Sequence, residues 1–117
     1  MGAVLGMGKN LHFVQPEDGS DRLEITGEPF EVTNMAYSSG AEVKALAERT
    51  LGIPPSYWPF YTEIDLEWDV PLEDARLKCA HLREVFSRHS PADLPDDYWL
   101  RFLADLLRRE WDFYTHL

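Results

Sequence analysis

Eight residues, from Glu63 to Val70, alternate strictly between acidic and apolar side chains. In a β-strand, successive side chains point to opposite faces, so a strict alternation predicts a strand that buries one face. The apolar face would hold Ile64, Leu66, Trp68 and Val70. The opposite face would hold four acids, which we call the acidic ladder: Glu63, Asp65, Glu67 and Asp69.

Segments before the ladder also have strand patterns. Lys9 to Val14 predicts a short first strand, and the alternating stretches Arg22–Thr26 and Phe30–Thr33 flank a Gly-Glu-Pro turn at 27–29. Two such stretches around a turn are typical of a β-hairpin. One face of this hairpin would be buried and formed by Leu23, Ile25, Phe30 and Val32.

Two helices are predicted from caps and apolar spacing. The first spans residues 40–51, because Ser39 and Glu42 form a capping box before it and Gly52 is a natural stop after it. The second runs from about Pro71 to Arg88. Its apolar residues form a narrow stripe that would pack on one side: Leu72, Ala75, Cys79, Leu82 and Phe86.

A third helix is predicted from residues 93–95 to about Tyr114. Its apolar residues cover an arc of about 200°, so it needs cover on two sides, from the aromatic loop described below or from another copy of the chain. Glu110 falls inside this arc, and we expect the last turn to fray so that its carboxylate reaches water or an arginine.

These patterns predict an α+β fold with a small antiparallel sheet of three or four strands packed against three helices. A chain of 117 residues has the usual size of one domain, so we expect a single domain over residues 1–117. Within it, residues 1–9 form a segment that can be disordered.

The net charge of −10 is unevenly distributed. Residues 1–75 hold 14 acids against four bases, whereas residues 76–117 hold seven of each. Nucleic acids and anionic membranes repel such a chain, because their binding requires Lys and Arg near phosphates. A field of this sign steers cationic partners, although it also serves solubility.

Compartment and anchoring signals are sparse. No uncharged apolar run approaches the 18 or so residues of a membrane helix, and residues 1–14 lack a signal-peptide pattern. The single cysteine, Cys79, cannot form an internal disulfide. We therefore expect a cytoplasmic protein.

The acidic ladder has three interpretations. Neighbouring carboxylates on one strand face lie about 7 Å apart and repel by about 0.6 kcal/mol per pair in bulk water. No base occurs between Thr50 and Ala75 to offset this repulsion. The ladder is therefore a solvated face that discourages aggregation, a docking face for a basic protein, or a site for a hard cation such as calcium or magnesium.

An aromatic loop precedes the ladder. Pro54, Pro55 and Pro59 exclude a regular helix or a central strand over residues 53–61. Aromatic rings on such a stiff loop are good interface anchors, unless they fold back to cover the third helix. The rings concerned are those of Tyr57, Trp58, Phe60 and Tyr61.

No catalytic constellation is found, and neither a cofactor nor a resident metal is expected. Cys79 sits in the middle of an apolar stripe, which is typical of an inert core thiol. The four histidines show no metal-ligand spacing, and no serine has a nucleophile-elbow motif. Asp93, Asp96 and Asp97 are explained by capping at a helix start.

In size, acidity and aromatic content, although not in any motif, the chain resembles small bacterial immunity proteins that neutralise basic nuclease toxins. The resemblance implies a non-catalytic inhibitor of a basic protein, and the ladder together with the aromatic loop would bind that partner. Two alternatives stay open. One is an assembly module that forms a homodimer through its last helix, and the other is a metal-dependent hydrolase that uses Glu63, Asp65 and other carboxylates.

Overall fold

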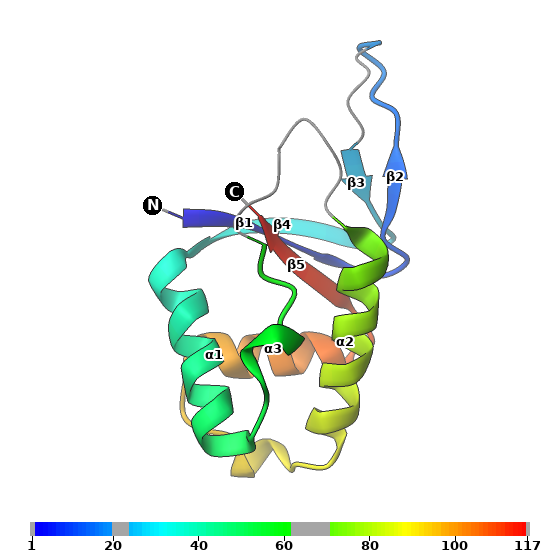
Figure 1. Ribbon diagram of the computed structural model, residues 1–117. Helices are drawn as coiled ribbons and strands as arrows, with labels where there is room; N and C mark the ends of the chain where they lie inside the picture. Colours follow the sequence, from blue (N-terminus) through cyan, green and yellow to red (C-terminus); the bar gives the residue numbers. More distant parts are fainter. Residues whose placement is uncertain (1, 20–23, 62–70, 117) are drawn as a thin grey trace.

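The computed structural model describes residues 2–19, 24–61 and 71–116. Its strands are β1 (Gly2–Gly8), β2 (His12–Val14), β3 (Glu24–Thr26), β4 (Phe30–Ala36) and β5 (Asp112–His116). Its helices are α1 (Tyr37–Leu51), α2 (Leu72–Ser87) and α3 (Tyr98–Arg108). The predicted α+β class is confirmed: three helices lie on one side of a three-stranded sheet, and β2 with β3 forms a two-stranded ribbon on the other (Figure 1).

The main sheet has the order β4-β1-β5 and is antiparallel throughout. β1 is central, and its Ala3, Leu5 and Met7 are buried on the side of the helices. On the opposite face, Gly6 leaves room for a tyrosine ring, since a Cβ at this position would lie 2.4 Å from Cζ of Tyr114. Residues 2–8, which the sequence left as a segment that can be disordered, thus supply the middle strand of the sheet.

The core lies between the sheet and the helices. α2 packs against α3 and β5, and α1 packs against α3 and β4. The buried residues of α2 are Leu72, Ala75, Cys79, Leu82 and Phe86, which confirms the predicted stripe residue by residue. No helix within the described ranges is both long enough and apolar enough to cross a bilayer.

The predicted hairpin is wrong in its pairing. β3 pairs with β2, and β4 pairs with β1, so the two stretches do not pair with each other. Val32 is 56% exposed instead of buried. The reason is that β1 is longer than β3 and aligns with all seven residues of β4, from Gly2 opposite Ala36 to Gly8 opposite Phe30.

The predicted third helix is too long at both ends. α3 begins after Asp97, whose Oδ1 accepts a hydrogen bond from the Leu100 amide at 2.9 Å, and it ends at Arg108. Glu110 has a φ of 63° in the turn that follows and is exposed, as expected for its carboxylate. Residues 112–116 are a strand, so the wide apolar arc belongs to two different elements.

The bounds of the other helices differ only slightly from the predicted ones. α1 begins at Tyr37, with Ala36 as its N-cap and no side-chain cap, so the Ser39–Glu42 capping box is wrong. Gly52 ends α1 as expected, with a φ of 69° and its amide directed to the carbonyls of Ala47 and Glu48. The predicted strand over residues 63–70 lies outside the described residues.

Candidate functional site

The structure places only the aromatic half of the predicted site. Glu63, Asp65, Glu67 and Asp69 lie outside the described residues, so their common exposed face stays a prediction. The loop before them is irregular, as predicted, with one 3₁₀ turn at Pro55–Tyr57.

Trp58 belongs to the core rather than to the surface. Its side chain is 2% exposed, and its ring centroid lies 6.3 Å from that of Phe86 and 6.4 Å from that of Phe113. Phe60 stacks on Trp58 at 5.5 Å and is half-buried. These two rings therefore cover α2 and β5, and Trp58 offers no free surface to a partner.

The loop also covers one edge of the main sheet. The Tyr61 amide donates to the Thr115 carbonyl at 2.8 Å, and the Thr115 amide donates to the Pro59 carbonyl at 2.9 Å. This short parallel bridge satisfies backbone groups of β5 that would otherwise face solvent. The outer edge of β5 is thus protected by residues 59–61.

Tyr57 and Tyr61 are half-buried and contact α2. The Tyr61 hydroxyl donates to Oδ2 of Asp74 at 2.7 Å, and Nζ of Lys78 lies 3.0 Å from the same oxygen. Burial, reinforced by the Asp74 carboxylate, raises the pKa of Tyr61 far above its ordinary value. The hydrogen bond from Tyr61, followed by that from Lys78, lowers the pKa of Asp74. These groups hold the end of the loop on α2, so the geometry assigns them a positioning role.

The ion pairs separate the chain into two electrostatic parts. In the described residues, all six ion pairs lie between residues 73 and 112: Arg76–Glu73, Lys78–Asp74, Arg83–Asp112, Arg88–Glu84, Arg101–Asp96 and Arg109–Asp105. Four bases of α2 and α3 are therefore matched by nearby acids, namely Arg76, Lys78, Arg83 and Arg101. The acids of residues 1–75 that take part in these pairs are Glu73 and Asp74, at the start of α2.

The described acids of residues 2–61 are exposed. None of the six glutamates described in that range forms an ion pair with a described base: Glu17, Glu24, Glu28, Glu31, Glu42 and Glu48. They lie on β3, β4, α1 and the connections between strands. The uneven charge of the sequence is thus retained on the described surface of the folded chain.

Cys79 is fully buried on α2. Its Sγ contacts both the amide and the carbonyl of Phe113 at 3.3 Å, and burial raises the pKa of the thiol to about 12. A thiol with this pKa holds almost no thiolate near neutral pH, so it is a poor nucleophile. Within the described ranges, no three His, Cys, Asp or Glu side chains are placed to hold a metal ion.

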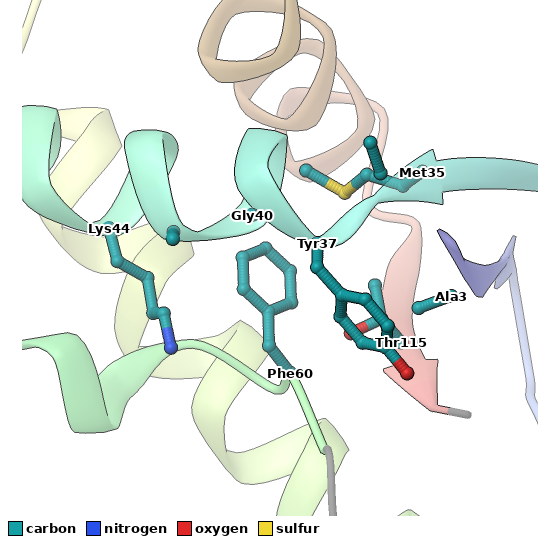
Figure 2. A pocket seen from close by; sticks show the side chains of 9 residues that line it. Ala3, Met35, Tyr37, Gly40, Lys44, Phe60 and Thr115 are labelled. Carbon is teal, nitrogen blue, oxygen red and sulfur yellow. The ribbon is translucent and has the colours of Figure 1, made fainter. Parts of the chain in front are cut away.

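A small apolar cavity of about 210 Å³ lies beside the first turns of α1 (Figure 2). Figure 2 shows the Phe60 ring opposite Gly40, with Lys44 one turn further along the helix. A Cβ at Gly40 would lie 3.7 Å from Cδ2 of Phe60, which is an ordinary contact distance, so the ring packs closely against this turn. The lining combines residues of β1, β4, α1, β5 and the aromatic loop, so no local sequence signal indicates it. It contains no acid–base pair that could support catalysis.

A second aromatic cluster lies at the start of α3. The Tyr98 ring stacks on Phe102 at 6.0 Å and meets Trp99 edge-on at 5.3 Å. Tyr98 is 70% exposed, and Trp99 and Phe102 are half-buried. The sequence reasoning did not name these rings as a binding surface. The available signal was the wide apolar arc, which required a second cover for this helix.

Comparison of the chain with known protein families, with curated proteins and with solved structures finds no match.

Proposed function

We propose that this chain is a non-catalytic binding protein that engages a basic protein partner and inhibits it by covering its surface. The observation that carries the proposal is the separation of charges. Arg76, Lys78, Arg83 and Arg101 pair with acids near them, while the exposed glutamates described in residues 2–61 form no ion pair with a described base. A surface of this kind attracts cations over distance and raises association rates with a basic protein.

The acidic ladder is part of this proposal because it adds four acids to the same half of the sequence. Mutual repulsion among four carboxylates is relieved when a cationic surface covers them. We assign Tyr57 and Tyr61 to the margin of the contact, since both are half-buried and Tyr61 lies two residues before Glu63 in the sequence. A cytoplasmic location is included in the proposal, because a single buried thiol suits a reducing compartment.

The test compares two charge reversals of equal size. The first variant carries Glu67→Lys and Asp69→Lys in the ladder. The matched control carries Asp93→Lys and Glu110→Lys, which reverse two exposed acids outside the acidic half. The immobilised wild type and each variant are incubated with lysate of the native cell at about 50 and 300 mM salt, and the bound proteins are identified. The association rate of the captured partner is then measured by surface plasmon resonance.

We expect a basic protein that is captured by the wild type and the control but lost with the ladder variant. Its association rate should fall steeply with salt, as expected for electrostatic steering. Equal capture by all three proteins, or capture that is insensitive to salt, contradicts the proposal.

A second candidate is an assembly module that self-associates through α3, and the observation in its favour is the exposure of Tyr98. Sedimentation velocity separates the two functions. A stable homodimer that binds no basic protein supports the module.

A further inference from the structure

The two outer strands of the main sheet, β4 and β5, differ in the backbone hydrogen bonds at their outer edges. The outer edge of β5 receives backbone hydrogen bonds from residues 59–61, as described above. Among the described residues, β4 pairs with β1 alone, so its other edge has no backbone partner. As far as the described residues go, one edge of the sheet is covered and the other is open.

The open edge has few of the usual protections against strand pairing. Natural edge strands are commonly short or carry proline, charged residues (lysine above all) or a bulge, and β4 has one charged residue, Glu31. β4 has seven residues, contains neither proline nor a base, and pairs with β1 in unbroken register. Residues 31–34 are all exposed, and among them Val32 is an apolar side chain at 56% exposure.

A cleft of about 450 Å³ lies between this edge and α3. Its walls are the aromatic cluster of α3 on one side and β1 with β4 on the other, through Met7, Glu31, Val32, Thr33, Tyr98, Trp99 and Phe102. Among the lining residues that the structure describes, Glu31 is the charged one. Glu31 and Thr33 lie opposite Met7 and Leu5 in the register, so they share the sheet face that looks toward the helices.

We propose that β4 accepts an extended basic segment of the protein partner as an added antiparallel or parallel strand. Alternate side chains of that segment would enter the cleft, where an arginine or lysine meets the Glu31 carboxylate and the exposed Tyr98 ring. The proposal rests on the proposed function and adds the contact surface to it.

Charge selects this occupant over a second copy of the chain. A second copy would bring another net charge of −10 and another Glu31 to the same edge. A basic strand brings charge of the opposite sign to a cleft that contains one acid and three aromatic rings. Guanidinium groups stack on aromatic faces and pair with carboxylates, so both features of the cleft favour it.

The probe is the synthetic peptide acetyl-(Arg-Val)₃-Arg-amide, whose seven residues match the length of β4. It is titrated into the ¹⁵N-labelled full chain at about 50 mM salt, with the corresponding Glu-Val peptide as the charge control. We expect shifts concentrated in residues 30–36 and 98–102, slower amide exchange in β4, and no binding of the Glu-Val peptide.

Two N-methylated forms of the peptide test for backbone pairing. One is methylated at its arginine amides and the other at its valine amides. Since alternate amides of a strand point to opposite edges, one form should bind at least about tenfold more weakly and the other should bind as the parent does. Equal binding of both forms shows attraction by charge alone and overturns the strand proposal.

Protein variants provide the matched comparison. Val32→Lys places a cation on the open edge, and we expect it to weaken binding at least about tenfold. Leu77→Lys is the control, because Leu77 on α2 has the same 56% exposure and lies outside the cleft. Tyr98→Ser should weaken binding about fivefold by removing the ring. Equal affinities of Val32→Lys and Leu77→Lys overturn the proposal.

The outcomes also separate this proposal from the proposed function. If the partner captured by the wild type is lost with the ladder variant but retained by Val32→Lys, the binding function holds and the edge is not its site. If sedimentation shows a dimer with β4 already protected in the free protein, the occupant is a second copy and the proposal fails.

Discussion

Arg83 joins α2 to the turn between α3 and β5. Its Nε donates to the Leu107 carbonyl at 3.0 Å, and its Nη2 donates to the Trp111 carbonyl at 2.9 Å and to Oδ1 of Asp112 at 3.2 Å. The two carbonyls lie at the end of the helix and just before the strand, so one guanidinium holds the point where the chain changes from helix to strand.

The loss in the free energy of unfolding caused by Arg83→Ala follows from these hydrogen bonds. Hydrogen bonds to a charged group contribute about 1.5–3 kcal/mol each when buried, and the Arg83 side chain is 31% exposed, so we discount each carbonyl bond to about 1–1.5 kcal/mol. The two bonds together predict a loss of about 2–3 kcal/mol in the free energy of unfolding. Arg83→Lys keeps the charge but not the planar fork, so we expect it to lose about half as much.

Arg76→Ala is the matched control. The Arg76 side chain is 34% exposed, close to the value for Arg83, but its partner Glu73 is 91% exposed. A pair of this kind along a helix contributes about 0.2–0.5 kcal/mol. The two alanine variants therefore remove the same side chain at similar exposure and differ in what the guanidinium holds.

Urea unfolding followed by circular dichroism and tryptophan fluorescence measures the difference. We expect the Arg83→Ala midpoint to fall well below that of Arg76→Ala at an unchanged m-value, with a melting temperature about 10 °C lower. If the two variants agree within about 0.5 kcal/mol, Arg83 does not stabilise the turn and the reasoning is refuted.

Three further predictions concern buried groups. Gly6→Ala should lower the free energy of unfolding by about 3 kcal/mol, because its Cβ would lie 2.4 Å from Cζ of Tyr114. In a double-mutant cycle measured by urea unfolding, Tyr114→Ala should remove most of this loss. Additive losses in the double variant would contradict the packing argument. Cys79 should not react with Ellman's reagent in the native protein at pH 8, since burial raises the pKa of its thiol to about 12. Rapid labelling without urea would contradict this, because it would show that the buried face of α2 is accessible to the reagent. Burial raises the pKa of Tyr114 to about 12 from 10, so its contribution to stability is complete below pH 10 and declines as pH rises toward 12. Unfolding measured at pH 9 and pH 11.5 should show a smaller decline for Tyr114→Phe, and an equal decline would refute the assignment.

The second helix was predictable because its signal is local. Five apolar residues at helical spacing leave the rest of the circumference polar, so one packing direction follows from the order of residues alone. The same reasoning placed Gly52 at the end of α1 and made the loop over residues 53–61 irregular.

The last twenty residues were not predictable in this way. From Tyr98 to Tyr114 the apolar residues are too dense to show a single period, and a helix buried on two sides resembles a helix followed by a buried strand. The strand exists because β1 offers an edge to residues 112–116, which is a contact between the two ends of the chain. The hairpin prediction failed for the same reason, since β1 provided β4 with a longer partner than β3.

The features of the candidate site also fall into two groups, those set by the local sequence and those set by contacts between distant segments. The composition and the order of residues in the sequence determined the acidic first part, the balanced second part, the stiff aromatic loop and the inert cysteine. These features depend on charge, proline geometry and helical spacing, which are properties of residues and their near neighbours. Only the tertiary structure decided that Trp58 is buried, that residues 59–61 cover β5, and that β1 is the one described strand that pairs with β4, beside the aromatic cluster of α3. Each of these depends on which distant segments meet, and a chain's order of residues constrains such long-range pairing weakly because many pairings bury similar apolar area.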